Sequence, residues 1–505
     1  MYTFSSKLKT LAFVLMVLGA LGIGYSFFTA PKSVEDAEKI IAASHAHGGH
    51  EAAEHHEEAA APAHHEAAAA GEAHVVAEGA HDTATAEHDS VTAETAAPSV
   101  EDTAGAVAAE APAHENHEAH AEAAHEGHNA HAAHDEHKEH AEHVFKQLQN
   151  KPWAAVYIAA LFFMLISVGV LAFYAIQNAA QAGWSPVLFR VMEGITAYLI
   201  PGAVIVLILL ALGVAQIHHL FVWMDPEVVK EDHLIQAKSG YLNGPFFLIR
   251  AVVFLGGWIV YRQFAVKKSL QQDEATDNIP YKKAFKGAAT FLVFFIISES
   301  ISSWDWIMSV DPHWYSTLFG WYVFASFFVS GITVIALVTL YLKSKGHLEY
   351  VNTSHIHDLA KFMFGISVFW TYLWFSQFML MWYADIPEEV VYFKMRIDNY
   401  TLPFFGMVVM NFIFPVLILI NTDFKRLSWI IVMAGIVILC GHYIDFFNMI
   451  MPATVGDQWF IGAGEVGAVL FFLGLFILVI FTALTKAPLL AKRNPLIEES
   501  KHFHY

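Results

Sequence analysis

The sequence predicts an all-α protein that crosses a membrane many times. More than half of its 505 residues are hydrophobic, 41 are phenylalanine, and the mean hydropathy is +0.44. Such a composition is typical of polytopic membrane proteins. Ten apolar runs are long enough to cross about 30 Å of hydrocarbon, which takes roughly 20 helical residues. They cover residues 9–29, 153–179, 187–215, 244–262, 284–308, 317–342, 359–383, 401–421, 428–450 and 460–484.

The first of these runs resembles a signal peptide but is better interpreted as an anchor. Lys7 and Lys9 precede an apolar core of about span length. The only candidate cleavage point, after Ala30, has the bulky Phe28 where a small residue is needed and is followed directly by Pro31. Residues 1–30 are therefore expected to remain as an N-terminal transmembrane anchor.

The acidity of the chain belongs to one segment. The formal net charge is -20, but of the 48 acidic and 28 basic residues, 25 and 4 lie in residues 31–150, which leaves 23 acidic and 24 basic residues elsewhere. Residues 31–147 consist mainly of Ala, Glu and His. This composition buries too little apolar surface to offset the loss of chain entropy, so mostly disorder with transient helix is expected.

Seven histidines in this segment recur at every third position. They are His125, His128, His131, His134, His137, His140 and His143. Imidazole at this density can bind Zn, Cu or Ni. Because a three-residue spacing drifts around an α-helix instead of following one face, metal binding is the weaker interpretation. A solvated, pH-sensitive acidic linker is the stronger one.

The placement of lysine and arginine predicts the topology. Basic residues occupy the connection between the fourth and fifth spans, two alternate connections after it, and the C-terminal tail, all on the side of Lys7 and Lys9. They are Arg262, Lys267, Lys268, Lys282, Lys283, Lys286, Lys343, Lys345, Lys425, Arg426, Lys486, Lys492 and Arg493. Both termini are therefore expected in the cytoplasm, with residues 31–147 on the opposite side.

Several polar residues fall at membrane depth in the fourth and fifth spans. Ionisable residues there are costly and indicate a partner, a cavity or a proton path. Ser298, Ser302, Asp305 and Ser309 fall within about 60° of one another on a helical wheel, and Glu299 lies beside them. Glu299 lies roughly 15 Å below the outer end of its span, too deep to reach water. Arg250, near the middle of the fourth span, requires a carboxylate partner, and Glu299 is one candidate.

Other candidates lie near the outer ends of later spans. Gln377 lies on the seventh span and Asp385 just beyond it, His442 and Asp445 are three residues apart on the ninth, and Glu465 begins the tenth. These residue types can accept, donate or pass on protons.

Two further sets of candidates have an equally simple or simpler structural interpretation. Asp311 and His313 follow the fifth span, where a capped turn within an interfacial belt of tryptophans accounts for them equally well. Glu193 lies one helical turn from Arg190 at the inner side, and an interfacial ion pair is the simpler interpretation.

The cysteine and histidine inventory limits the redox chemistry of the chain. Cys440 is the only cysteine, which excludes an internal disulfide, a CxxCH haem attachment and a cysteine-ligated iron–sulfur cluster within this chain. Only His442 lies well inside an apolar span, whereas a b-type haem held between helices requires two such histidines. We therefore expect no redox metal in this chain.

Two motifs resemble a known family. SWDWIMSVDPHWYSTLFG, at 303–320, and WFSQFMLMWYADIPEE, at 374–389, in a chain with ten spans, are similar to the NrfD-like quinol-interacting membrane proteins, and among them to the ActF subunits of the bacterial alternative complex III. The resemblance covers about residues 150–485. It implies two four-helix bundles, 148–312 and 313–452, with the first span and residues 453–505, which hold the last span, outside them.

The resemblance also implies a function in the bacterial inner membrane. Complexes of this family are quinol:cytochrome c oxidoreductases, in some cases coupled directly to a terminal oxidase. Haem c and iron–sulfur clusters are then expected in partner subunits, and the related ActC subunit is the stronger candidate for quinol oxidation. This chain would contribute assembly, a quinone-binding site or a proton path, and would not be catalytic alone. Lipid is an expected partner and nucleic acid is not.

Depth alone suggests an order for such a path. It would run from Glu193 through Arg250 and Glu299 to a final group on the outer side, which consists of Asp305, Asp445 and Glu465. A stand-alone proton-coupled transporter or channel also places charges at mid-membrane, and a purely structural subunit would hold them in fixed pairs. Both remain alternatives to the respiratory subunit.

Overall fold

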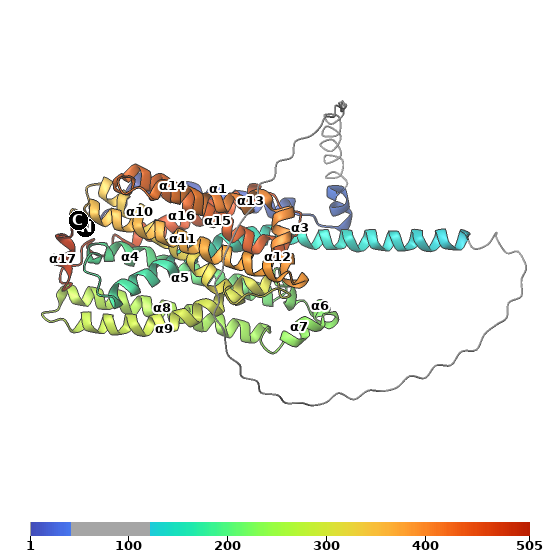
Figure 1. The fold of residues 1–505 in the computed structure, drawn as a ribbon, viewed down its shortest axis with the longest axis horizontal. Coiled ribbons are helices and arrows are strands. Elements are labelled where there is room, and N and C mark those ends of the chain that lie inside the picture. The colour runs from blue at the N-terminus through green and yellow to red at the C-terminus, as the bar shows by residue number, and fades with distance from the viewer. Residues whose placement is uncertain (1, 42–121, 505) are drawn as a thin grey trace, which may run out of the picture. The chain divides into compact units, whose positions relative to one another are not determined.

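The computed structural model describes residues 2–41 and 122–504, with the backbone alone for residues 122–137 and 139. This part of the chain is helical and contains no strand. Ten helical segments are long and apolar enough to cross a membrane, which confirms the ten predicted spans. The elements of these spans are α1 (Ser6–Thr29), α3 (Glu122–Ala179), α4 (Phe189–Ile195), α5 (Leu199–Val214), α8 (Gly244–Glu274), α9 (Ile279–Trp306), α10 (Phe319–Ser344), α11 (Thr353–Ala384), α13 (Thr401–Val408), α14 (Phe414–Leu419), α15 (Ser428–Val455) and α16 (Ala463–Ala483) (Figure 1). Shorter helices are α6 (Pro226–Glu231), α7 (His233–Lys238), α12 (Pro387–Asn399) and α17 (Ile497–Lys501).

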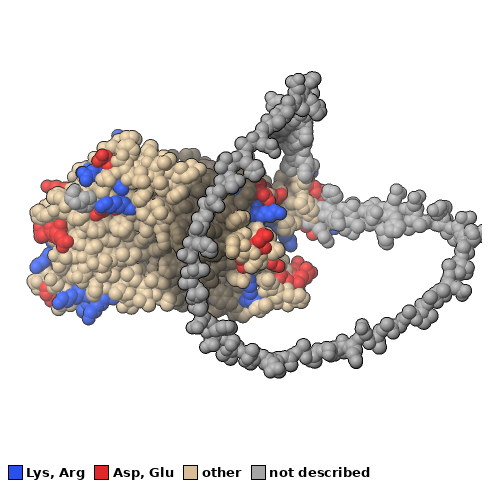
Figure 2. Space-filling model, in the orientation of Figure 1, with Lys and Arg blue, Asp and Glu red and all other residues tan. Residues whose placement is uncertain are grey.

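The connections between spans alternate between two ends of the helical body. Helix α17 and the α8–α9 connection lie at one end, and α6, α7 and α12 lie at the other (Figure 1). Both ends of the described chain lie at the first of these: the Tyr2 ring is 5.4 Å from the His347 ring, and Asn352 Nδ2 donates to Phe503 O at 2.6 Å. We call this the terminal end and the other the loop end. In Figure 2 charged residues gather at both ends and leave an uncharged band between them, as expected of a membrane-spanning body.

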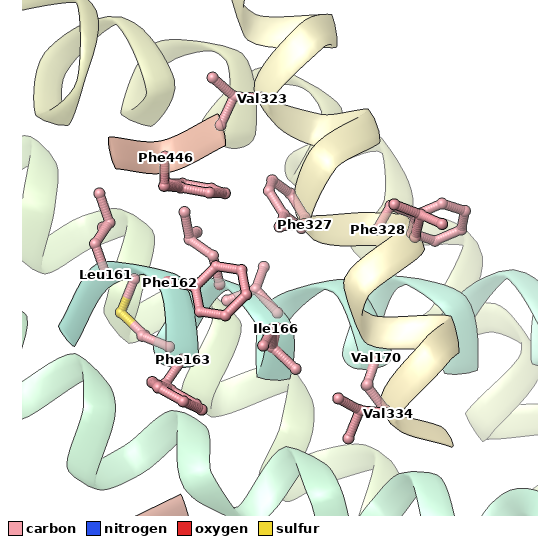
Figure 3. Packing of buried hydrophobic residues seen from close by; sticks show 14 of the residues in the cluster. Leu161, Phe162, Phe163, Ile166, Val170, Val323, Phe327, Phe328, Val334 and Phe446 are labelled. Carbon is pink, nitrogen blue, oxygen red and sulfur yellow. The ribbon is translucent and has the colours of Figure 1, made fainter. Parts of the chain in front are cut away.

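Helices α3 and α10 form the centre of the body, and the most apolar stretch of 18 residues in each is mostly buried. Phe162 of α3 packs against Phe446 of α15 at a ring distance of 5.6 Å (Figure 3). Phe173 of α3 packs against Phe328 of α10 at 5.9 Å. On one side α8 packs along α9 and against α5. On the other, α10 packs along α11 and α15, and α13 and α14 pack against α15 and α11.

Two spans are interrupted, and each interruption precedes a proline. In the third span a 3₁₀ turn at Thr196–Tyr198, just before Pro201, separates α4 from α5. The eighth span contains a π turn at Val409–Ile413, just before Pro415, which the sequence analysis did not anticipate. Proline has no amide hydrogen, so the carbonyl four residues earlier loses its helical partner and the turn rearranges around it.

The second span begins earlier than predicted. Helix α3 is continuous from Glu122, so residues 122–147 are helical, where mostly disorder with transient helix was predicted. Ala, Glu and Lys favour helix, and extending a helix already formed by the span avoids the cost of nucleation. Of the seven periodic histidines, His140 is exposed and His143 Nε2 lies 2.8 Å from Gln147 Nε2. The side chains of the other five, and residues 42–121, lie outside the described part of the chain.

Helix α1 packs along α16 through glycine. A Cβ atom added to Gly19 would lie 2.3 Å from the backbone nitrogen of Phe471 and 2.6 Å from the carbonyl oxygen of Gly467. Small residues at such contacts let two helix backbones approach closely in a membrane, where packing replaces the hydrophobic effect as the driving force. The N-terminal anchor helix α1 is thus held in place by α16, the last span.

This contact can be tested with a pair of valine substitutions on α1. Gly19→Val should force α1 away from α16 and lower the free energy of unfolding by about 1–3 kcal/mol, the usual effect of overpacking. Gly24→Val is the matched control, because a Cβ atom there meets nothing within 4 Å. Thermal unfolding in detergent should therefore show a lower midpoint for Gly19→Val alone. Equal shifts would mean that helix propensity, and not the α1–α16 contact, is responsible.

Candidate functional site

Arg250 of α8 is paired with Asp305 at the end of α9. Arg250 Nε lies 2.6 Å from Asp305 Oδ2, and Nη2 lies 3.0 Å from Oδ1. Tyr241 closes the pair, since its hydroxyl donates to Asp305 Oδ1 at 2.8 Å and its carbonyl accepts from Arg250 Nη1 at 3.1 Å. The guanidinium also lies 4.0 Å from the centre of the Tyr241 ring. Arg250 thus has the carboxylate partner that was expected, but this partner is Asp305 and not Glu299.

Glu299 is buried without a cation. Its carboxyl group accepts hydrogen bonds from Ser303 Oγ at 3.1 Å and Ser300 Oγ at 3.3 Å, both on its own helix. Among the described residues it forms no ion pair. An ionised carboxylate without a counter-charge is very unfavourable in an apolar interior. Glu299 can therefore hold a proton and stay neutral. Asp305 can stay ionised, because Arg250 supplies its counter-charge.

The serines of the predicted polar stripe are buried and bonded inside the protein. Ser298 Oγ accepts from Trp258 Nε1 at 2.9 Å, and Ser309 Oγ accepts from Trp223 Nε1 at 3.2 Å. Ser302 Oγ donates to the Glu299 carbonyl at 2.9 Å. The stripe therefore faces neighbouring helices, and two of its hydroxyls help to position tryptophans.

A second buried cluster joins α10, α11 and α15 around Asp445. Tyr322 donates its hydroxyl to Asp445 Oδ1, and Trp370 Nε1 donates to Oδ2 at 2.8 Å. His442, one turn earlier on α15, places Nδ1 3.6 Å from Asp445 Oδ2 and 2.9 Å from Ser326 Oγ. We call Asp445, His442, Tyr322, Trp370 and Ser326 the Asp445 cluster. Both Asp445 and His442 are fully buried.

The Asp445 cluster contains no permanent positive charge. Within the described chain, His442 is the one basic group at ion-pair distance from Asp445. The other ring nitrogen of His442, Nε2, is buried and has no hydrogen-bond partner there. One proton shared between an imidazole and a carboxylate gives either two neutral groups or an ion pair, and the neutral form avoids the cost of buried charge. The cluster can thus take up and release a proton.

A narrow cavity adjoins Tyr322 of the Asp445 cluster. It has a volume of about 10 Å³, close to the space that one water molecule requires. Gln377 and Arg396 also line it, and Gln377 Oε1 accepts from Ser316 Oγ at 3.2 Å. A quinone ring needs a cavity of several hundred Å³, so this space suits water.

Arg396, on α12, was not among the predicted residues. Pro452 interrupts the hydrogen bonding of α15 and frees the carbonyl of Asn448, which accepts from Arg396 Nε at 2.9 Å. The guanidinium lies 3.3 Å from the centre of the Tyr392 ring. Burial raises the pKa of Tyr392 to about 12, so this phenol stays neutral. The signal in the sequence was a basic residue in a loop expected on the outer side, which the positive-inside rule disfavours.

The remaining predicted residues lie apart from these clusters. Glu193 pairs with Arg190 at 2.7 Å, as the simpler interpretation held, and Arg190 also binds Asp273, which was not predicted, at 2.6 Å. Glu465 caps the start of α16, where its Oε2 accepts from the Gly462 amide at 2.8 Å. Asp385 is exposed, at the end of α11.

The proton path that depth suggested, from Glu193 through Arg250 and Glu299 to the outer side, is not continuous in the structure, because its residues lie in separate places. Glu193 lies with Arg190 and Asp273, Arg250 with Asp305, and Glu465 with its own helix start. Over the described ranges, no side-chain hydrogen bond joins one of these groups to Glu299 or to the Asp445 cluster. The same ranges contain no group of three side chains suited to a metal ion.

No model of a known protein family matches the chain, and a search of curated proteins finds no match either.

The Arg250–Asp305 pair can be tested by removing one partner and then both. Asp305→Asn should lower the free energy of unfolding by about 3–5 kcal/mol, because it leaves a buried guanidinium without its counter-charge. The double variant Arg250→Met/Asp305→Leu should recover much of that loss, since no unpaired charge remains. Denaturant unfolding in micelles measures all three proteins, with Asp311→Asn as the control on the following turn. If the double variant were the least stable, the pair itself would be the source of stability.

The stability of the folded segment at the loop end should depend on pH through Asp232, which lies outside the spans. Its carboxylate accepts from the Ile235 amide at 3.1 Å, which with the hydrogen bond from His313 at 2.5 Å lowers its pKa. Because the pKa of Asp232 is lower in the folded loop, its ionised carboxylate stabilises this loop at pH values above the ordinary, unfolded pKa of about 4. That stabilisation is lost as the pH falls from there through the lower pKa of the folded state. Amide exchange in residues 233–238, corrected for intrinsic rates, should therefore accelerate below about pH 4. Asp232→Asn should remove this dependence, and an unchanged profile would contradict the assignment.

Proposed function

We propose that this chain is an integral membrane subunit of a respiratory quinol:cytochrome c oxidoreductase of the alternative complex III type, and that it provides a proton path within the complex. In this proposal it contains no redox metal, because its single cysteine cannot anchor haem c or an iron–sulfur cluster. Quinone is the redox ligand of the membrane part of the complex. The proposal rests on the two quoted motifs and on the chemistry of the Asp445 cluster.

The Asp445 cluster carries this proposal. Quinol oxidation releases protons, and a proton acceptor in an apolar site must avoid isolated charge. Asp445 and His442 lie 3.6 Å apart, both fully buried, with neutral donors from Tyr322 and Trp370 around them. Such a pair can accept and pass on a proton, and the neighbouring cavity has room for a water molecule. We therefore favour a proton path over a quinone-binding site in this part of the chain.

The proposed orientation follows from the basic residues at the terminal end. By the positive-inside rule that end faces the cytoplasm of a bacterial cell, and the loop end faces the periplasm. Asp305, near the end of α9, and the Asp445 cluster then belong to the periplasmic half. A proton accepted there leaves on the periplasmic side, the side on which quinol-oxidising complexes release protons.

The proposed architecture is NrfD-like. Residues 148–312 and 313–452 would form two four-helix bundles, an arrangement supported by the packing of α8 with α9 and α5, and of α10 with α11 and α15. Residues 1–30 and 453–505 contribute the peripheral α1–α16 pair. In this proposal haem c, the iron–sulfur clusters and the quinol-oxidising ActC paralogue belong to partner subunits, and a terminal oxidase is the onward acceptor in some assemblies.

A stand-alone proton-coupled transporter is the second candidate, because the same cluster could serve a proton-coupled cycle. The two are distinguished by native purification. A respiratory subunit co-migrates with haem c and iron–sulfur subunits, whereas a transporter migrates without them.

The role of Asp445 is tested in the intact complex, reconstituted in proteoliposomes. Asp445→Asn keeps the shape of the side chain but cannot take up a proton, and should lower both quinol:cytochrome c turnover and proton release per electron, turnover by about tenfold or more. Asp385→Asn is the matched control: this aspartate is exposed, and its left-handed conformation (φ 48°) suits asparagine. Haem content confirms assembly of both variants. If Asp445→Asn leaves turnover and proton release unchanged, the chain is a structural subunit.

A further inference from the structure

A large groove lies at the terminal end, away from both buried clusters. Its volume is about 820 Å³, and it is bounded by α1, α4, α5, α8 and α16. Four basic residues line it: Lys9, Arg190, Arg262 and Lys486. The rest of the lining is mostly apolar, and its one acidic residue is Glu193.

Most of the positive charge in this groove is unpaired. Arg190 is neutralised by Glu193 and Asp273. The Arg262 guanidinium donates only to neutral oxygens, the Thr196 hydroxyl at 3.4 Å and the Glu193 carbonyl at 3.5 Å. Lys9 and Lys486 are exposed and form no ion pair with any described residue. Lys9, Arg262 and Lys486 therefore form no ion pair with a described carboxylate, and four cations against the two carboxylates at Arg190 leave the groove with a net charge of +2.

On α1 and α16 the apolar residues of the groove lie deeper in the spans than the lysines, whereas on α8 the apolar Val266 and Leu270 lie between Arg262 and the terminal end. Phe13 lies one turn beyond Lys9 on α1. Leu478 lies on α16, and Lys486 follows just after the end of this helix at Ala483. Both apolar residues are thus farther from the terminal end than the lysines. Along α1 and α16 the groove thus presents lysines toward the terminal end and an apolar surface farther into the spans.

We propose that this groove binds an anionic phospholipid. The phosphate lies among Lys9, Arg262 and Lys486, and the acyl chains lie along Phe13 and Leu478. Guanidinium and ammonium groups are the usual partners of phosphate, and basic pockets between transmembrane helices bind anionic head groups. A zwitterionic lipid carries its own cation and would leave the net positive charge unbalanced. The bound lipid joins the peripheral α1–α16 pair to α4 and α8.

The test uses the purified, delipidated full-length chain or its complex in a neutral detergent. Its thermal unfolding midpoint is measured during titration with dioleoyl phosphatidylglycerol, dioleoyl phosphatidylcholine or inorganic phosphate. Phosphatidylglycerol should raise the midpoint of the wild-type protein in a saturable manner, while the other two should have little effect. Lys9→Gln/Lys486→Gln should weaken the apparent affinity for phosphatidylglycerol at least about tenfold.

Lys282→Gln/Lys283→Gln is the matched control. It removes two exposed lysines from the same end of the protein, outside the lining of the groove. Because the lysines of both variants are exposed, folding is expected to be retained, and Arg262→Gln tests the same site at a half-buried position. Equal weakening by both double variants would indicate general surface attraction and overturn the proposal. An equal response to phosphatidylcholine, an equal response to phosphate alone, or no lipid response at all would also overturn it.

Discussion

Hydrocarbon offers no hydrogen-bonding partner, so a polar group buried in the spans is costly unless another part of the protein satisfies it. The structure meets this demand in several ways. Arg250 is held by the carboxylate of Asp305, serine hydroxyls of α9 accept tryptophan N–H groups, and Arg396 occupies the Asn448 carbonyl that Pro452 leaves free. These pairings fix the side chains of Trp223 and Trp258 and hold α12 against α15.

The two buried carboxylate clusters differ in how their charge is balanced. Asp305 faces a guanidinium, which is always charged, so the pair is stable as two opposite charges. Asp445 faces an imidazole, a phenol and an indole, none of which is permanently charged. A proton can therefore move on or off the second cluster without leaving a fixed charge unpaired. This difference, more than depth in the membrane, separates a structural pair from a group suited to proton transfer.

The peripheral α1–α16 pair also creates a candidate binding site. Helices α3 and α10 pack together at the centre of the body through their buried apolar stretches, whereas α1 touches the rest mainly through α16. Such an outer pair leaves a groove against α4 and α8, and the basic residues of the terminal end line it. The same lysines that predict the orientation of the chain are thus positioned to bind an anionic lipid on that side.

The sequence by itself determined the properties that depend on neighbours along the chain. Hydropathy over about 20 residues identified the ten spans, and a three-residue spacing identified the Arg190–Glu193 pair. Only the tertiary structure decided which side chains meet across helices. Glu299 and Asp305 lie on one helix about 120° apart, and the rotation of α9 against α8, set by packing, directs Asp305 and not Glu299 at Arg250. Arg396 likewise binds a group on another helix, the carbonyl of Asn448 that Pro452 leaves free. Arg396 and Pro452 are more than fifty residues apart, and such a contact leaves no periodic signal in the sequence.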